Sequence, residues 1–172
     1  MSIFIFSRAV RTGKTTELQN WCMQQKNVCG VLMPDENEKR KIVDISTKNT
    51  FDIECDDAAN TTEELVKAGK FYFYQSAFDK ANIIFEQALY KNPSWVIIDE
   101  IGKLELLKKG FYPSLKKMIT AYAEKKLTGN LLLVVRDSLV NEVIEFLGIK
   151  NYTLVNELTA FINKILKLIF DI

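Results

Sequence analysis

The sequence predicts an α/β fold in which a mainly parallel sheet is flanked by helices. Short apolar runs alternate with segments of helical periodicity along the whole chain, which is typical of parallel α/β sheets. The length of 172 residues fits one domain, and 48% apolar with 26% charged residues is ordinary for a globular protein. The chain has no repeats, low-complexity tracts or linkers, so residues 1–172 are predicted to form a single domain.

The N-terminal part is predicted to form strand, turn, helix and strand in that order. Ile3–Phe6 is an apolar run, and after a polar turn a helix is expected from about Lys14. The apolar face of that helix consists of Leu18, Trp21 and Cys22. A charged turn and alternating residues after Pro34 indicate a small antiparallel β insertion beside the parallel sheet, over residues 31–55. Strands are expected here at residues 28–33, 42–45 and 51–54.

The rest of the chain alternates between helix and strand. Apolar runs predict strands at residues 71–74, 95–98, 131–135 and 152–154. Apolar stripes predict helices at 63–68, from Ser76 to Leu89, from Pro113 to Tyr122, at 140–147 and at 158–169. Local signals mark the ends of several helices: Gly69 and Gly148 favour C-termini, Ser76 with Asp79 resembles a capping box, and Pro113 suits a first turn.

Composition excludes several classes of function. With 23 Lys+Arg against 22 Asp+Glu the net charge is +1, so bulk electrostatics give no support to nucleic-acid or membrane binding. The run Leu131–Val135 is far shorter than the ~20 residues of a membrane helix, and Ile3–Phe6 is too short for a secretion signal. The 3 cysteines are odd in number and lack CxxC spacing, so neither a disulfide framework nor a zinc site is expected, and the cytoplasm is the expected compartment.

The chain contains no histidine. This excludes Ser-His and Cys-His triads, His-ligated metals and the commonest general acid or base. Any chemistry must therefore draw on carboxylates, Lys, Arg, hydroxyls or backbone amides, with or without a hard metal ion.

A phosphate-binding loop is predicted between the first strand and the first helix, where Gly13-Lys14-Thr15-Thr16 is located. In such loops backbone N–H groups face the phosphates, the Lys neutralises β/γ oxygens and the Thr hydroxyl ligates Mg²⁺. The expected nucleotide-binding residues are Arg8, Ala9, Val10, Arg11, Thr12, Gly13, Lys14, Thr15 and Thr16. The pattern GxxxxGK[ST] has glycine where this chain has Arg8, and Arg11 replaces another frequent glycine. The alternative is a plain strand-to-helix turn.

Two acids, Asp99 and Glu100, follow the apolar strand at 95–98, at the sheet edge where ligands bind in open α/β folds. We expect Asp99 to hold Mg²⁺ and Glu100 to activate water, which favours a hydrolase over a kinase. Where this acid pair occurs in phosphate-loop proteins, an extra strand separates the loop strand from the acid strand, and residues 131–135 are the candidate. Arg136 would then lie near the γ-phosphate as a third catalytic residue with Glu100 and Lys14, the alternative being a surface salt bridge.

These motifs resemble the small nucleoside-triphosphatases, the family that includes the cancer-related nucleoside-triphosphatase and its prokaryotic relatives. The resemblance covers residues 3 to 150 and is carried by Gly13-Lys14-Thr15-Thr16, by the run Val96 to Leu106, by Phe111, by Gly30-Val31-Leu32 and by Lys39-Arg40-Lys41. It implies a RecA-like P-loop core and Mg²⁺-dependent hydrolysis of nucleoside triphosphates of the ATP/GTP class with loose base selectivity. It also implies that Lys14 and Thr15 bind phosphate and Mg²⁺, that Asp99 serves the metal and that Glu100 is the base. Glu105 matches a second family acid with no derived role.

Two other functions stay open at this point: a nucleotide or small-metabolite kinase, and a non-catalytic nucleotide-binding switch. The remaining features have simpler interpretations. The aromatic run 71–74 is expected to pack in a sheet, the basic turn 39–41 to solubilise a hairpin, and the lysines at 103, 108, 109, 116 and 117 to face solvent. No residue pattern indicates a protein partner.

Overall fold

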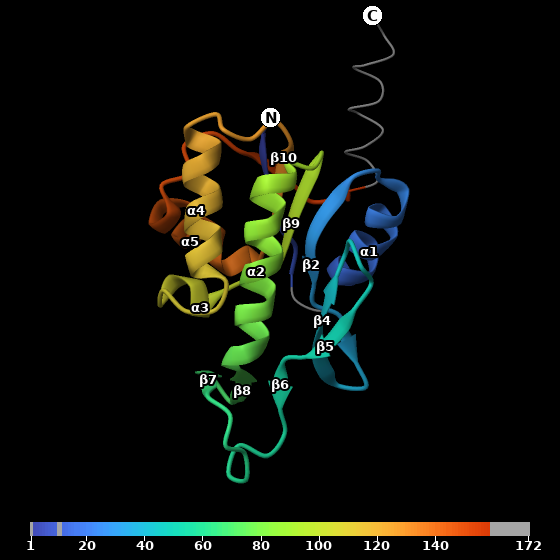
Figure 1. Ribbon diagram of the computed structural model, residues 1–172. Helices are drawn as coiled ribbons and strands as arrows, with labels where there is room; N and C mark the ends of the chain where they lie inside the picture. The colour runs from blue at the N-terminus through green and yellow to red at the C-terminus, as the bar shows by residue number, and fades with distance from the viewer. Residues whose placement is uncertain (1, 10–11, 159–172) are drawn as a thin grey trace, which may run out of the picture.

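The computed structural model of the protein describes residues 2–9 and 12–158. Its main sheet is formed by β1 (Ile3–Phe6), β2 (Val28–Leu32), β3 (Asp35–Glu36), β4 (Lys39–Asp44), β5 (Thr50–Asp52), β9 (Trp95–Ile101), β10 (Asn130–Val135) and β11 (Thr153–Val155). The strand order is β11-β1-β10-β9-β2-β4-β3, and β5 pairs with β4 (Figure 1). The strands from β11 to β2 are parallel and β4 joins β2 antiparallel, which confirms the predicted mainly parallel sheet.

Helices cover both faces of the parallel part. The helical segments are α1 (Lys14–Gln24), α2 (Gln75–Lys91), α3 (Lys103–Leu106), α4 (Tyr112–Ala123), α5 (Val140–Leu147) and a 3₁₀ turn at Asp137–Leu139. In Figure 1, α2 and α4 lie side by side in front of the sheet, and α1 lies beyond β2. The predicted helix beyond residue 158 lies outside the described residues.

The two faces of the sheet contribute to two apolar cores, because successive residues of a strand point to opposite sides. In β10, Leu131, Leu133 and Val135 belong to the core under α2, α4 and α5, whereas Leu132 and Val134 belong to the core under α1. All five side chains are buried. Burial on both faces explains why the run is apolar throughout instead of alternating.

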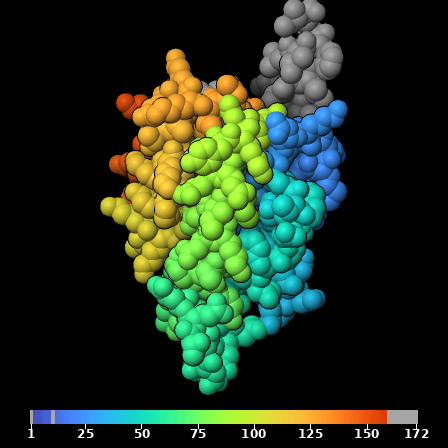
Figure 2. All heavy atoms as spheres, viewed as in Figure 1, coloured from blue at the N-terminus to red at the C-terminus, as the bar shows by residue number. Residues whose placement is uncertain are grey.

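The antiparallel part extends further than residues 31–55. A second sheet with strand order β6-β8-β7 follows, formed by β6 (Glu54–Cys55), β7 (Leu65–Ala68) and β8 (Phe71–Tyr74). These labels mark the lower end of the molecule in Figure 1, which Figure 2 shows as a protruding lobe. The predicted helix at 63–68 is therefore wrong. Gly69, with φ +61°, is the first residue of a two-residue turn between the paired Ala68 and Phe71, and does not end a helix.

Two further details differ from expectation. Strand β9 continues to Ile101, so both acids lie within the strand and not after it. Helix α2 begins at Gln75 without a side-chain cap, and the Ser76 hydroxyl donates to Glu63 Oε2 at 3.0 Å, so the predicted capping box is absent.

Gly30 allows β2 to lie close against β9. Its φ is +119°, and a Cβ atom here would lie 2.0 Å from the carbonyl oxygen of Ile97. Only glycine fits this position, because a side chain would collide with the neighbouring strand's backbone. The contact holds β2 beside the strand that carries the two acids.

Candidate active site

The structure describes both ends of the loop between β1 and α1, residues 7–9 and residues 12–13. Gly13 precedes the first helical residue with φ 76° and ψ 21°, a left-handed conformation that glycine adopts at low cost. The Thr12 hydroxyl donates to the Ala9 carbonyl at 2.8 Å, which closes the turn. Val10 and Arg11 lie outside the described residues.

The Lys14 ammonium spans the loop. Its Nζ donates to the carbonyl oxygens of Arg8 at 2.8 Å and Ala9 at 2.9 Å. The first residue of α1 is thereby tied to the residues that follow β1. A positive charge is held over the loop, beside the backbone N–H groups at the start of α1.

Arg8, which replaces a usual loop glycine, is engaged with α1. Its guanidinium lies 5.2 Å from the ring centroid of Phe6 and forms an ion pair of 2.6 Å with Glu17, whose other carboxylate oxygen accepts the Leu158 N–H. The buried Ser7 Oγ and Arg8 Nε have no hydrogen-bond partner among the described residues. Buried polar atoms without partners are uncommon, so their presence in this loop fits a site built to receive a polar ligand.

Asp99 is the buried acid of the site, with a relative exposure of 1%. Its Oδ2 accepts the Met33 N–H at 3.0 Å. Burial is the main cause that raises the pKa of Asp99, to about 7; the Glu100 charge adds to this, while the Met33 N–H, the Lys14 ammonium and the Thr15 hydroxyl oppose it. Asp99 of β9 and the first two residues of α1 are thus close enough to interact.

Glu100 and Arg136 form the second charged pair. Arg136 Nε lies 2.6 Å from Glu100 Oε1, and both side chains are partly exposed. Strand β10 separates β1 from β9 in the sheet, and Arg136 directly follows it. The inserted strand was predicted from the sequence, but the direct contact between Arg136 and Glu100 was not.

Glu105 has a structural role that sequence reasoning missed. Its carboxylate is buried and accepts the N–H of Gly102 at 2.8 Å and the N–H of Phe111 at 3.0 Å. It therefore holds together the segment between β9 and α4, directly after the acid pair. Burial raises the pKa of Glu105 to about 7.

We expect Glu105→Gln to destabilise the fold by about 1–3 kcal/mol at pH 5, because the amide turns an NH₂ group toward one of the two backbone donors. The loss should shrink at higher pH. The folded-state pKa lies above the ordinary value of 4.5, so the folded wild type binds more protons, and its stability falls as pH rises from about 4.5 to about 7. The Gln side chain does not titrate, so the stability of the variant lacks this pH-dependent contribution. Urea unfolding at pH 5 and pH 8, without nucleotide or metal, measures both effects; identical pH dependence in the two proteins would contradict the prediction.

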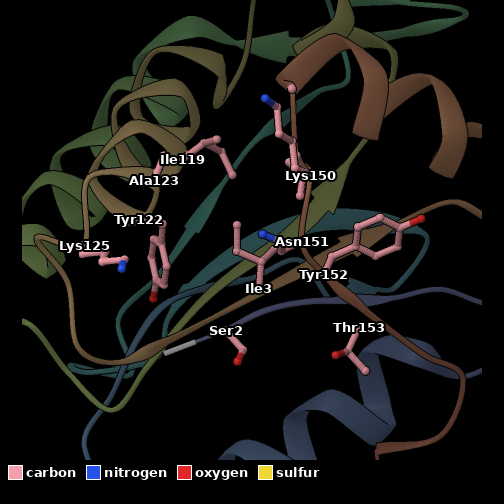
Figure 3. Close-up of a pocket in the computed structure, with 12 residues that line it drawn as sticks. Ser2, Ile3, Ile119, Tyr122, Ala123, Lys125, Lys150, Asn151, Tyr152 and Thr153 are labelled. Carbon is pink, nitrogen blue, oxygen red and sulfur yellow. The ribbon is translucent and has the colours of Figure 1, made fainter.

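Two hollows flank the loop and the acids. One, of about 440 Å³, follows the loop and α1 and is lined by Arg8, Thr12, Gly13, Thr16, Glu17, Asn20, Trp21 and Gln24. The other, of about 250 Å³, adjoins Glu100 and Arg136. A further hollow of about 620 Å³ lies between the start of β1, the end of α4 and the residues before β11 (Figure 3). It has no residue in common with the loop or the acid pair.

A divalent metal ion bound here would need ligands from the substrate phosphates as well as from the protein. Among residues 2–9 and 12–158, no three His, Cys, Asp or Glu side chains cluster to hold a metal ion. The Thr15 hydroxyl interacts with the Asp99 carboxylate, and both groups offer hard oxygen atoms of the kind that would suit Mg²⁺ bound by one carboxylate plus substrate phosphates. Within the same residues, no helix has the length and apolar character needed to cross a membrane.

A parallel sheet with a Gly-Lys-Thr loop between its first strand and first helix defines a P-loop nucleotide-binding protein. The sequence matches the profile of the family described as NTPase over residues 3–165, and the chain belongs to that family. The crystal structure of THEP1 from the hyperthermophile Aquifex aeolicus has a similar fold: the TM-score is 0.70 at 18% identity, over 98% of this chain and 97% of THEP1. No curated protein matches the sequence. The family and fold inferred from the motifs are confirmed.

Proposed function

We propose that this protein hydrolyses nucleoside triphosphates to diphosphate and phosphate with Mg²⁺. The observation that carries the proposal is the Glu100–Arg136 pair, which directly follows Asp99, the acid that interacts with Lys14 and Thr15. A carboxylate and a guanidinium next to the expected γ-phosphate are the two groups that attack by water requires, one for the proton and one for the developing charge.

The phosphates would lie on the loop from residue 8 to Thr16, with backbone N–H groups and Lys14 as donors. Nucleotide binding would draw the Lys14 ammonium from the carbonyls of Arg8 and Ala9 onto phosphate oxygens. Thr15 and Asp99 would hold Mg²⁺, which supplies charge neutralisation at the β- and γ-oxygens.

In the hydrolytic step, Glu100 orients a water molecule in line with the γ-phosphorus and takes its proton. Arg136 stabilises the charge that spreads over the equatorial oxygens. Because the two side chains are in contact, Arg136 also orients the Glu100 carboxylate.

The nucleoside would lie in the hollow along α1, since Lys14, Asp99 and Glu100 mark the opposite, γ-phosphate end. This hollow is lined largely by flexible polar side chains such as Asn20 and Gln24. Such groups can pair with any base edge, which supports loose base selectivity. The three cysteines are free, buried thiols, which accords with the cytoplasm as the compartment.

The direct test is phosphate release from a panel of nucleoside triphosphates, with and without Mg²⁺ and with no acceptor added. We expect release from several of them, all dependent on Mg²⁺. Release that requires an added acceptor, or no release at all, would refute hydrolysis as the basal activity.

We expect Lys14→Ala to weaken triphosphate affinity by about 10–100-fold, the value of one charge-assisted hydrogen-bonding group. The fold should persist, because Lys14 is only half-buried and contacts loop carbonyls. Calorimetric titration with ATP and Mg²⁺ measures the affinity, and Lys91→Ala at the exposed end of α2 is the matched control. Equal affinity in both variants would rule out the phosphate-loop assignment.

A further inference from the structure

We propose that the hollow beside Glu100 and Arg136 binds a second substrate that accepts the γ-phosphoryl group in place of water. The acceptor is a small planar heteroaromatic compound that carries an anionic group and a free hydroxyl. This proposal rests on the proposed binding of a nucleoside triphosphate, and it adds an activity to hydrolysis.

The position of the hollow is the first argument. It is lined by Met33, Arg40, Ala68, Gly69, Lys70, Phe71, Phe73, Phe78, Glu100, Gly102, Lys103, Leu104, Glu105, Phe111, Arg136 and Leu139. It shares no residue with the hollow along α1 that would take the nucleoside. Because the proposed function puts the γ-phosphate beside Glu100 and Arg136, a ligand in this hollow would meet that end of the triphosphate.

Arg40 gives the second argument. Its guanidinium lies 5.0 Å from the ring centroid of Phe71 and 5.8 Å from that of Phe73, and the side chain is half-buried. Among the described residues no carboxylate forms an ion pair with this guanidinium, whereas both neighbouring lysines on β4 are paired with acids. A half-buried guanidinium without a carboxylate partner is suited to a carboxylate or phosphate of a ligand, which it can hold through two hydrogen bonds.

The remaining charges favour an anionic ligand as well. Lys70 and Lys103 line the hollow and are exposed. The Glu100 charge is balanced by Arg136, and the Glu105 carboxylate is already occupied by two backbone donors. The unbalanced charges of the hollow are therefore positive.

The volume and the apolar lining of the hollow limit the size of the ligand that it can hold. Phe73, Phe78 and Phe111 are buried beneath the hollow and stack edge to face, whereas Phe71 stays half-exposed at its wall. A volume of about 250 Å³ suits one heterocycle with its substituents. The β7–β8 hairpin supplies this wall, so the lobe at the lower end of Figure 2 contributes lining residues to the hollow.

The chemical step balances without any further reactant. The acceptor hydroxyl oxygen attacks the γ-phosphorus, and its proton passes to the Glu100 carboxylate. The bond between the γ-phosphorus and the β,γ-bridging oxygen breaks, and the nucleoside diphosphate leaves with the electron pair. Glu100 serves water and hydroxyl equally, because both give up one proton on attack.

The test uses [γ-³²P]ATP and Mg²⁺ with the full chain and separates labelled products. The acceptors offered are ribonucleoside 5′-monophosphates and phosphorylated hydroxymethyl-pyridines and -pyrimidines, with uncharged ribonucleosides as controls that lack the anionic group. We expect label in an organic product with at least one of the anionic acceptors, in competition with phosphate release.

Arg40→Ala should raise the acceptor concentration for half-maximal transfer by about 10–100-fold. Lys39→Ala, one residue earlier and paired with Asp56 at the surface, should leave it unchanged. Arg40→Lys keeps the charge and should restore part of the loss; urea unfolding of each variant excludes misfolding. Label in phosphate alone with every acceptor, or transfer equally efficient in Arg40→Ala, would overturn the acceptor site while leaving hydrolysis intact. Failure of the wild type to release phosphate at all would instead refute the proposed function.

Discussion

Replacing Glu100 by Gln should lower single-turnover hydrolysis by about 10²–10⁴-fold, the usual contribution of a general base. The amide keeps the size of the side chain and one oxygen that can still accept from Arg136 Nε, but it cannot take a proton from water. Nucleotide and Mg²⁺ should bind almost as before, because the phosphate loop and Asp99 are unchanged. The substitution should therefore lower the rate of turnover and leave the affinity for nucleotide nearly unchanged.

Single-turnover hydrolysis of ATP, alongside direct binding, separates the two quantities. Glu142→Gln, an exposed acid in the first turn of α5, is the matched control. Asp99→Asn gives the contrasting pattern, in which Mg²⁺ dependence and binding weaken together. Hydrolysis at the parental rate in Glu100→Gln would remove Glu100 from the mechanism.

Arg136→Ala is expected to reduce turnover by up to about 10³-fold with little change in affinity, as for arginines that stabilise the transition state of phosphoryl transfer. The structure adds a second cause, since the Glu100 carboxylate loses the guanidinium 2.6 Å from it. The two substitutions should therefore not be additive.

A double-mutant cycle with Glu100→Gln and Arg136→Ala measures this coupling. If Arg136 acts only by orienting Glu100, the double variant will be no slower than Glu100→Gln alone. If Arg136 also contacts the phosphate, the double variant will be slower still. A parental rate in Arg136→Ala would leave the residue as a surface ion pair, the alternative interpretation of the sequence.

The sequence was sufficient to predict the parts of the site that depend on local order along the chain. The loop from residue 8 to Thr16 follows a strand and precedes a helix, and Asp99 and Glu100 end an apolar run; both patterns can be recognised without tertiary structure. The position of β10 between β1 and β9 was also predicted, because the Gly-Lys-Thr loop occurs together with the Asp99-Glu100 pair. The strands β9 and β10 could be recognised because they are short and buried on both faces, so each is a continuous apolar run.

The remaining features depend on long-range contacts that no local pattern encodes. Leu65–Ala68 becomes a strand because β8 pairs with it, although its short apolar stripe also suits a helix. Glu105 becomes a structural acid because Phe111 presents its N–H six residues later. Arg40 was assigned to a solvated turn, since only the folded insertion brings it over Phe71 and beside the hollow next to Glu100. A Gly-Lys turn between two apolar runs was the one signal that could have revealed the hairpin.

The placement of β1 has a consequence for synthesis of the chain on the ribosome. Both neighbours of β1 are strands from the far end of the sequence, β10 on one side and β11 on the other. Both edges of β1 therefore stay unpaired until residues 130–155 have been translated. The strand that precedes the phosphate loop therefore lacks both of its neighbours until then. We expect a chain truncated before β10 to carry the Gly-Lys-Thr motif and yet fail to bind nucleotide.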